Sequence, residues 1–275
     1  MGQNLPFHLK ITFQAFEEYI ERAIKILFSK TLIVLMIHIE KDPQVLSQSL
    51  AEWITQTIET TLQTKDRFTW VLTGGNSPKL LYELLALSPC KERIAWEKLH
   101  IFWGDERAVP FNDDRNNAKM TYKHLLNKVP VPPGQVHVMR TDIEPEQSAQ
   151  EYQKILHEYF GKQGNSFDLV LSGMGDDGHT LSLFPGTKVI HEKVDWVKAF
   201  YLEPQKMYRI TLTAPIVNRA TAVAFLTFGA NKAKALQQVL EGASDVDLYP
   251  SQIIQPVSGN LHWFVDEAAA SLLEH

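Results

Sequence analysis

The stretch from Phe167 to Gly186, FDLVLSGMGDDGHTLSLFPG, carries the side chains of this chain that are best suited to proton transfer. It opens with an apolar run typical of a buried parallel strand and continues into a glycine-rich loop. Asp176 and Asp177 precede His179, and histidine is the side chain that most readily exchanges a proton near neutral pH. Because open α/β sheets bind ligands at the carboxyl ends of their strands, we expect a catalytic site here.

Three glycines of this loop, Gly173, Gly175 and Gly178, are expected to allow positive φ angles and a close approach to a ligand. They also satisfy G-x-G-x-x-G, the fingerprint of dinucleotide binding. That fingerprint requires a long helix facing a pyrophosphate, whereas a Pro-Gly pair closes the following segment here. The two aspartates would also repel the pyrophosphate. The nicotinamide interpretation is therefore weak, and no cofactor is predicted.

The aspartates beside His179 could raise its pKa, fix its tautomer or only cap the loop, and the ring could simply satisfy loop backbone groups. Asp and His also ligate zinc or manganese, but no second histidine lies at ligand spacing, so no metal is predicted. Eight other histidines lack comparable surroundings and are expected to be packing or surface residues: His8, His38, His100, His124, His137, His157, His191 and His262.

A second polar loop, Thr73-Gly74-Gly75-Asn76-Ser77, forms a glycine turn that opens a helix at Pro78. Exposed backbone N–H groups and the helix dipole favour an anion there, most simply a phosphate. The P-loop spacing is absent, so a nucleoside triphosphate is not implied. An ordinary strand-to-helix turn capped by Ser77 explains the same residues equally well.

The third polar loop is Gly104–Arg107, in which Arg107 could grip phosphate oxygens in bidentate fashion. Asp105 could orient a sugar hydroxyl or steady a catalytic group. A surface ion pair between Glu106 and Arg107 is the commoner fate of such residues. The polar segment continues through residues 115–117, RNN, which are further candidates for lining the same cleft.

The fourth loop, Gly229–Lys232, ends in a lysine at the first turn of a predicted helix. A cation is unfavourable at that end of a helix unless it faces an anion, which favours a phosphate role for Lys232. Arg209, in the segment Arg-Ile-Thr-Leu, is expected to be structural or peripheral.

Composition bounds the class of protein. The 275 residues are 44% hydrophobic, and the formal net charge of −5 gives no sign of nucleic-acid or membrane binding. Cys90 is the single cysteine, which excludes an internal disulfide and fits a reducing compartment. Thr31–Ile39 is too short to span a bilayer, and we expect a cytoplasmic protein.

Strands and helices alternate from residue 31 onward, and each of the four polar loops directly follows a predicted strand. The predicted strands are 32–37, 68–72, 99–103, 167–171, 196–201, 209–212, 222–228 and 261–265, and the predicted helices are 43–63, 78–86, 117–126, 146–160, 231–241 and 266–273. This order predicts an α/β fold with a mainly parallel, doubly wound, Rossmann-like sheet, helices on both faces and a small additional lobe. The four loops would then share one edge of the sheet.

Residues 31–275 are expected to form a single domain. Residues 1–30 are expected to be an N-terminal extension, because Phe16, Ile20, Ala23, Ile24 and Leu27 follow the spacing of an amphipathic helix.

Taken together, these loops resemble the 6-phosphogluconolactonase family, within the wider glucosamine-6-phosphate isomerase/6-phosphogluconolactonase superfamily. The similar stretches are Leu72–Leu85, Trp96–Pro110, Gly173–Gly186 and Arg209–Leu236. The resemblance implies hydrolysis of 6-phospho-D-glucono-1,5-lactone, a phosphorylated sugar lactone, in the pentose phosphate pathway. It implies catalytic roles for His179, as the base that activates water, and for Asp105, beside the reacting end of the sugar. Substrate binding falls to Gly74, Gly75, Asn76, Ser77, Arg107, Gly175, Asp177 and Lys232.

Loop N–H groups around Gly175–Gly178 are candidates for stabilising the oxyanion. Leu181 departs from the alanine usual in the family, as do Ala230 and Asn231 from the residues usual before Lys232.

Two alternatives remain open. A glucosamine-6-phosphate isomerase or deaminase would share the fold, but those enzymes usually have an acidic residue shortly after Asp-Gly-His, where this chain has Thr180–Phe184. A non-catalytic sugar-phosphate sensor would need Arg107 and Lys232 but not His179. The sequence leaves monomer or dimer undecided.

Overall fold

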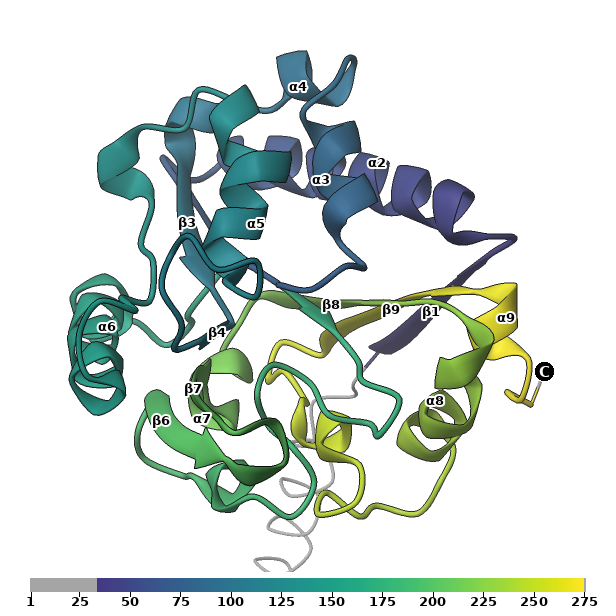
Figure 1. Cartoon of the computed structure of the whole chain (residues 1–275). Helices are drawn as coiled ribbons and strands as arrows, with labels where there is room; N and C mark the ends of the chain where they lie inside the picture. The colour runs from purple at the N-terminus through teal and green to yellow at the C-terminus, as the bar shows by residue number, and fades with distance from the viewer. Residues whose placement is uncertain (1–33, 275) are drawn as a thin grey trace, which may run out of the picture. The chain divides into compact units, whose positions relative to one another are not determined.

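The computed structural model describes residues 34–274. The predicted N-terminal amphipathic helix lies outside the described residues. Within them, six strands form one sheet in the order β1-β9-β8-β5-β2-β3, and every neighbouring pair is parallel (Figure 1). The strands are β1 (Val34–Glu40), β2 (Phe68–Leu72), β3 (Leu99–Trp103), β5 (Leu169–Gly173), β8 (Ala222–Thr227) and β9 (Asn260–Asp266).

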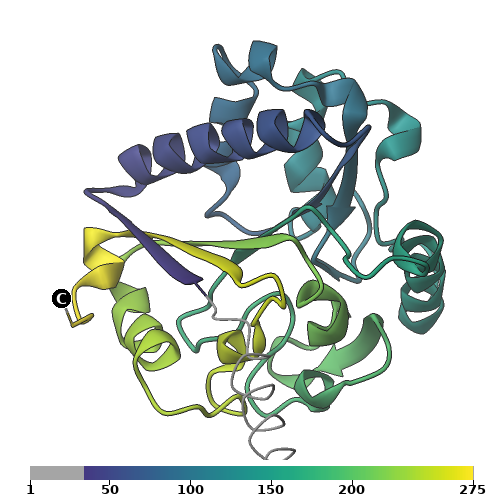
Figure 2. The same cartoon turned by 180° about the vertical axis from the view of Figure 1, so that it is seen from behind.

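Helices cover both faces of this sheet, as the views from the front and from behind show (Figures 1 and 2). One face carries α2 (Pro43–Leu62), α3 (Lys79–Leu85), α4 (Cys90–Arg93) and α5 (Asn117–His124). The other carries α6 (Pro145–Phe160), α7 (Ala214–Val217), α8 (Ala233–Leu240) and α9 (Glu267–Ala270). Short 3-10 turns are η1 (Trp96–Lys98), η2 (Leu126–Lys128), η3 (Pro133–Gln135), η4 (Lys188–His191), η5 (Glu203–Gln205), η6 (Ala230–Lys232) and η7 (Pro250–Ile253). The doubly wound α/β prediction is confirmed.

The alternation of side chains along the buried strands produces two hydrophobic cores, one on each face. In β2, Trp70 and Leu72 pack into the core under α2 and α3, whereas Val71 packs into the core against α6. A parallel strand covered on both faces needs apolar residues in both registers, which is why these strands are continuous apolar runs.

The predicted small lobe is a separate three-stranded antiparallel sheet in the order β4-β7-β6. Its strands are β4 (Asp105–Arg107), β6 (Val197–Leu202) and β7 (Met207–Leu212). Residues 105–107 were expected in a loop, but they pair with β7, with Arg107 opposite Arg209.

Gly104 is the single residue between the two sheets. Its N–H donates to the carbonyl of Leu72 in β2 (3.1 Å), and its carbonyl accepts from the N–H of Leu212 in β7 (2.8 Å). The backbone of this one residue therefore links the large sheet to the small one.

The winding direction of the large sheet reverses between β2 and β5. The chain runs outward from β2 to β3 at one edge, whereas β5, β8 and β9 run in the opposite direction toward β1. Such a switch point leaves a crevice at the carboxyl ends of the strands, where open α/β sheets bind ligands. The loops that follow β2 and β5 flank it.

Sequence and structure agree on β2 and β3 to the residue and differ elsewhere by a few residues. Strand β5 begins two residues later than predicted, at Leu169. The predicted helix 231–241 begins as the 3-10 turn η6 and becomes α-helical only at Ala233.

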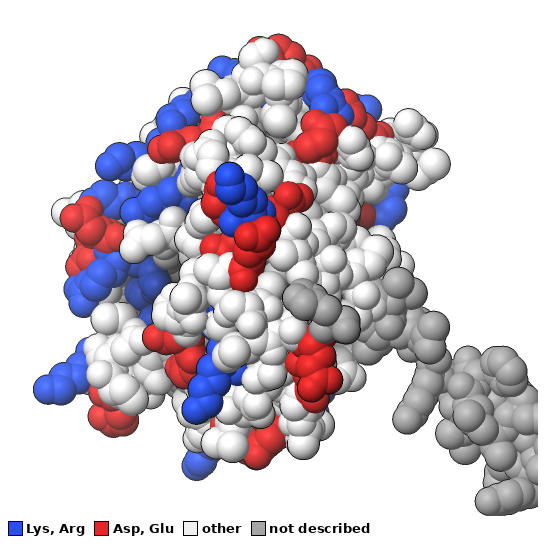
Figure 3. All heavy atoms as spheres, turned by 90° about the vertical axis from the view of Figure 1, so that its right-hand side faces the viewer, with Lys and Arg blue, Asp and Glu red and all other residues white. Residues whose placement is uncertain are grey.

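Acidic and basic side chains are interspersed on the face that Figure 3 displays, with uncharged areas between them. In residues 34–274, no helix combines the length and the apolar character needed to cross a membrane.

Candidate active site

The four polar loops meet in one pocket at the carboxyl edge of the large sheet. Its lining comes from the ends of β2, β3, β5 and β8 together with Arg209 of β7. The lining residues are Thr73, Gly74, Gly75, Asn76, Ser77, Pro78, Asp105, Arg107, Asn117, Gly173, Met174, Gly175, His179, Leu181, Arg209, Leu226 and Lys232. The structure thus brings together most of the site residues expected from the sequence. Asp177 does not line the pocket but contacts the ring of His179, and the candidates Arg115 and Asn116 do not line it either, so that part of the prediction is wrong.

His179 is held with one ring nitrogen occupied and the other available. Its Nδ1 lies 2.5 Å from Oδ1 of Asp177, and its ring stacks on Phe184 with centroids 4.1 Å apart. The side chain is 26% exposed, so water can reach it. A carboxylate at Nδ1 favours the tautomer that carries its proton there, which leaves the lone pair of Nε2 free to accept a proton.

Asp177 stays ionised in this arrangement. Partial burial alone raises the pKa of Asp177, but hydrogen bonds from the ring and backbone N–H of His179 bring that pKa below its usual value. The Asp177–His179 pair therefore has the orienting part of a catalytic triad. Among residues 34–274, no side-chain nucleophile is hydrogen-bonded to the histidine.

The glycines of this loop serve different purposes. Only Gly178 has a positive φ, +78°, so the expectation of positive φ at Gly173 and Gly175 is wrong. Gly175 is required for space, because a Cβ there would lie 2.1 Å from Nδ1 of His179. The N–H groups of Gly175 and Gly178 donate to the carbonyls of His179 and Gly175, so these two candidate oxyanion donors are already occupied.

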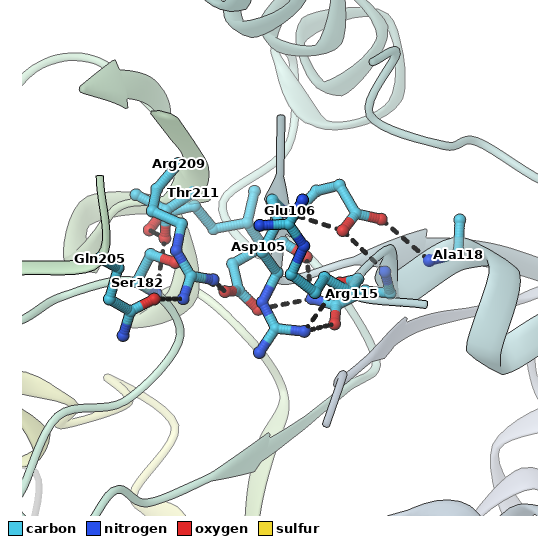
Figure 4. Close-up of polar contacts among 11 residues, drawn as sticks. Asp105, Glu106, Arg115, Ala118, Ser182, Gln205, Arg209 and Thr211 are labelled. Atoms are coloured by element: carbon cyan, nitrogen blue, oxygen red, sulfur yellow. Dashed lines mark hydrogen bonds and ion pairs between the residues drawn. The ribbon is translucent and has the colours of Figure 1, made fainter. Parts of the chain in front are cut away.

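Asp105 is buried and held from three sides (Figure 4). Its Oδ2 accepts from the hydroxyl of Ser182 at 2.6 Å and lies 3.6 Å from Nη1 of Arg209. Its backbone carbonyl accepts from Nδ2 of Asn117 at 2.9 Å. Asp105 is therefore a fixed negative charge in the wall of the pocket.

Two arginines bring positive charge to the same wall. Nη1 of Arg107 donates to Oδ1 of Asn117 at 2.6 Å and to the carbonyl of Arg115 at 3.0 Å. Nη2 of Arg209 donates to Gln205 at 2.5 Å, and burial lowers the pKa of Arg209 to about 10 even though Asp105 opposes that shift. Arg209 therefore remains cationic at neutral pH.

The Nε groups of Arg107 and Arg209 are buried and have no acceptor among residues 34–274. Buried donors without a partner are rare in folded proteins. Since both side chains line the pocket, an anionic ligand is the acceptor that would satisfy them.

Glu106 does not form the surface ion pair that sequence reasoning considered. It is 1% exposed, and its carboxylate accepts from the backbone N–H groups of Arg107, Asn117 and Ala118 at 2.7–2.8 Å. Burial raises the pKa of Glu106 to about 7, although these three hydrogen bonds oppose the shift.

The loop after β2 is fixed by Tyr82, whose hydroxyl accepts from the N–H of Thr73 and donates to its carbonyl. Gly75 has a φ of +86°, and a Cβ at Gly74 would lie 1.8 Å from Oδ1 of Asn117. The N-cap of α3 is Pro78 and not Ser77, so the expected capping role of Ser77 is wrong, and Ser77 instead lines the pocket.

Lys232 lies at the N-cap of α8 and has no ion-pair or hydrogen-bond partner among the side chains of the described part of the chain. A free cation at the positive end of a helix is electrostatically unfavourable, which makes an anion beside it favourable. The preceding turn is set by Gly229, whose φ is +96° and whose N–H donates to Asp266.

Sequence reasoning missed Arg209, Leu181 and Ser182. Arg209 was expected to be peripheral, but it is 4% exposed and lines the pocket. The signal that could have identified Arg209 is its single charge in a strand of otherwise apolar and Thr residues. A charged residue in such a strand is buried only if it has a partner. Ser182 carried no signal, since its contact with Asp105 spans 77 residues of sequence.

Leu181 adopts a left-handed conformation with φ of +53°, uncommon for a large side chain, and covers one wall of the pocket. Its Cδ2 would lie 2.6 Å from a Cβ on Gly104, which explains a glycine at the junction of the two sheets.

The sequence of this chain is similar to those of known proteins. The sequence model described as glucosamine-6-phosphate isomerases/6-phosphogluconolactonase matches residues 41–263. A 6-phosphogluconolactonase of Synechocystis is 37% identical over 84% of this chain and 95% of its own length. One of Nostoc is 38% identical over 78% and 89%. A rice relative named as probable and chloroplastic is 35% identical over 84% of this chain and 73% of its own length.

Solved structures show the same fold. The 6-phosphogluconolactonase of Trypanosoma brucei superposes with a TM-score of 0.76 at 27% identity, covering 88% of this chain and all of that one. The 6-phosphogluconolactonase of Thermotoga maritima gives 0.74 at 28% identity, covering 84% and 99%. A monomeric glucosamine-6-phosphate deaminase shares the fold, with a TM-score of 0.74, at only 18% identity.

Proposed function

Because the chain belongs to the 6-phosphogluconolactonases, the lactone hydrolases of the glucosamine-6-phosphate isomerase/6-phosphogluconolactonase superfamily, we propose that it hydrolyses 6-phospho-D-glucono-1,5-lactone with a water molecule that His179 activates. The single observation that carries the mechanism is the Asp177–His179 pair, which leaves Nε2 free in a pocket with water access.

In the first half of the reaction, Nε2 of His179 accepts a proton from water as the water oxygen bonds to the C1 carbonyl carbon. The carbonyl electron pair moves to its oxygen and forms a tetrahedral oxyanion. The carboxylate of Asp177 stabilises the imidazolium that results.

In the second half, the oxyanion collapses and the bond between C1 and the ring oxygen breaks. The imidazolium returns its proton to that oxygen, which leaves as the 5-hydroxyl. The new carboxylic acid loses its proton to solvent, so the enzyme regains its starting protonation state. Asp105, fixed by Ser182 and Arg209, lies in the wall where it can orient a sugar hydroxyl.

The phosphate is held at the cationic part of the pocket. Arg107 supplies its Nε–H and Lys232 its ammonium, both without a side-chain partner among residues 34–274, and the glycine turn Gly74–Ser77 supplies backbone and hydroxyl groups. A guanidinium and an ammonium together match the charge of a phosphate monoester.

The first experiment measures lactone hydrolysis, with the substrate generated in place by glucose-6-phosphate dehydrogenase. We expect a large acceleration over buffer that His179→Ala abolishes while 6-phosphogluconate still binds. Equal rates with and without the protein would exclude the lactonase. If binding persisted without hydrolysis in the unaltered chain, the sensor alternative would stand, and release of ammonia from glucosamine 6-phosphate would identify an isomerase or deaminase.

Three further expectations complete the proposal. Residues 31–275 act as one domain, the residues before them form an extension, and the protein works in the cytoplasm as a monomer or dimer. The chloroplastic relative from rice makes the compartment a specific point to test, by microscopy of the tagged full chain.

A further inference from the structure

Glu106 lies between two functional side chains and points away from both. Along β4 the side chains of Asp105 and Arg107 line the pocket, while that of Glu106 turns to the opposite face, toward the start of α5 (Figure 4). There its Oε1 accepts from the N–H of Asn117 (2.7 Å) and of Arg107 (2.8 Å), and its Oε2 accepts from the N–H of Ala118 (2.8 Å).

Asn117 carries the connection back to the pocket. It is 1% exposed, its Oδ1 accepts from Nη1 of Arg107 at 2.6 Å, and its Nδ2 donates to the carbonyl of Asp105 at 2.9 Å. Its position also depends on the missing Cβ of Gly74, so it fits closely against the loop after β2. Asn117 can make these contacts only if its backbone stays where Glu106 holds it.

We propose that Glu106 is a positioning residue, which fixes the first turn of α5 so that Asn117 holds Arg107 in the orientation that binds the substrate phosphate. This inference rests on the proposed function for the identity of the ligand. It assigns a role to a carboxylate that touches neither the lactone nor the reacting water.

The role requires a carboxylate and not merely a polar side chain. Three backbone N–H groups converge on two oxygens, and both oxygens accept. An amide has one acceptor oxygen and one donor nitrogen, so a glutamine in either orientation turns its nitrogen toward at least one N–H. The start of α5 must then shift, and the hydrogen bond from Asn117 to Arg107 lengthens or breaks.

The test compares phosphorylated and unphosphorylated ligands. Glu106→Gln is expected to weaken binding of 6-phosphogluconate by about tenfold or more, as is typical for loss of one charge-assisted contact. It is expected to raise KM for 6-phosphogluconolactone similarly, while kcat/KM for unphosphorylated gluconolactone, which presents no phosphate to Arg107, stays within about twofold of the unaltered chain. Glu106→Asp gives the same comparison if the amide variant does not fold.

Asn116→Ala is the matched control. Asn116 also caps α5, by accepting from the N–H of Lys119 at 2.8 Å, but it does not line the pocket. This variant is expected to leave 6-phosphogluconate binding unchanged. When Asn117→Ala is already present, Glu106→Gln is expected to cause no further loss of 6-phosphogluconate binding, because Glu106 affects Arg107 only through Asn117.

Three results would overturn the inference: unchanged 6-phosphogluconate binding in Glu106→Gln, an equal loss in Asn116→Ala, or additive losses with Asn117→Ala. The proposed function fails separately, if the unaltered chain does not hydrolyse the lactone. In that event the binding comparison still decides whether Glu106 positions Arg107.

Discussion

Histidines pair with a polar neighbour in two regions of this molecule, with opposite consequences. In the pocket, His179 bonds to the carboxylate of Asp177 and keeps Nε2 free beside water. At the β1–β9 edge, Nε2 of His38 lies 3.1 Å from Nδ1 of His262, and both rings stack against Phe264. Burial and, to a smaller extent, the charge of His38 together lower the pKa of His262 to about 4.

The difference shows that the group in contact with a histidine ring determines whether the ring can take up a proton. A carboxylate favours the positive charge that proton transfer creates, whereas apolar rings and a second imidazole disfavour it. The first pair is suited to catalysis and the second to packing. The following changes test that contrast, from the largest expected effect to the smallest.

His179→Gln is expected to reduce kcat by roughly 10²–10⁴, the usual contribution of a proton-transfer group. Because the ring is partly exposed, the free energy of unfolding should change by no more than about 0.5 kcal/mol. Steady-state kinetics and urea denaturation on the same preparation measure both. A large loss of stability with little loss of kcat would mean that His179 serves packing and not catalysis.

Asp177→Asn is expected to reduce kcat by about 10–100-fold and to leave KM nearly unchanged. The amide can still accept a hydrogen bond from Nδ1, but it has no charge to stabilise the imidazolium. The measurement is kcat and KM for 6-phosphogluconolactone. A rise in KM with unchanged kcat would place Asp177 in substrate binding instead.

His262→Phe is expected to make stability less dependent on pH. The pKa of His262 lies near 4 in the folded protein against 6.5 for the free side chain, so its contribution is complete above pH 6.5 and lost as the pH falls from 6.5 toward 4. At most ~3 kcal/mol is lost across this window. Urea denaturation at pH 7 and pH 4.5 compares the variant with the unaltered chain.

Burial also lowers the pKa of His137 to about 4, so His137 destabilises the folded protein at low pH in the same direction as His262. Because His137 is present in both proteins, the difference between them reports on His262 alone. The kcat of His262→Phe at pH 7 should equal that of the unaltered chain. Identical pH dependence in the two proteins would mean that His262 is not the group that titrates.

His38→Gln has the smallest expected effect, a loss of about 1 kcal/mol in the free energy of unfolding, typical of one hydrogen bond. Its ring is half-buried, and its pKa is lowered by burial against the opposing charge of Glu40. Thermal denaturation at pH 7 is sufficient to measure it. If His38→Gln lowered the free energy of unfolding more than His262→Phe does, His38 would be the histidine of this pair that contributes more to stability.

Local sequence patterns were sufficient to predict the bounds of the buried strands β2 and β3 and the edge of the sheet on which the polar loops lie. The apolar runs of β2 and β3 stand between turn residues, so their ends could be read directly. The loops after the strands could also be assigned to one edge, because parallel strands require it. The resemblance added the role proposed for His179 as the base that activates water, whereas the phosphate role of Arg107 was already indicated by its guanidinium at a strand end.

The remaining parts depend on contacts that sequence does not display. Glu106 beside Arg107 reads as an ion pair, and only the pairing of β4 with β7 turns Glu106 away to the start of α5. Arg209 becomes a pocket residue because β7 lies beside β4. The positive φ of Leu181 and its close fit against Gly104 have no local signature in the sequence.

Gly104 is the one residue between the two sheets, and its backbone is hydrogen-bonded to both. Asp105 and Arg107 belong to the small sheet and His179 to the large one, with Gly104 bonded to both. A tilt of one sheet against the other would therefore move Asp105 and Arg107 together relative to His179. Substitutions that change the angle between the two sheets would then change the distance from Asp105 and Arg107 to His179 while leaving all three side chains unaltered.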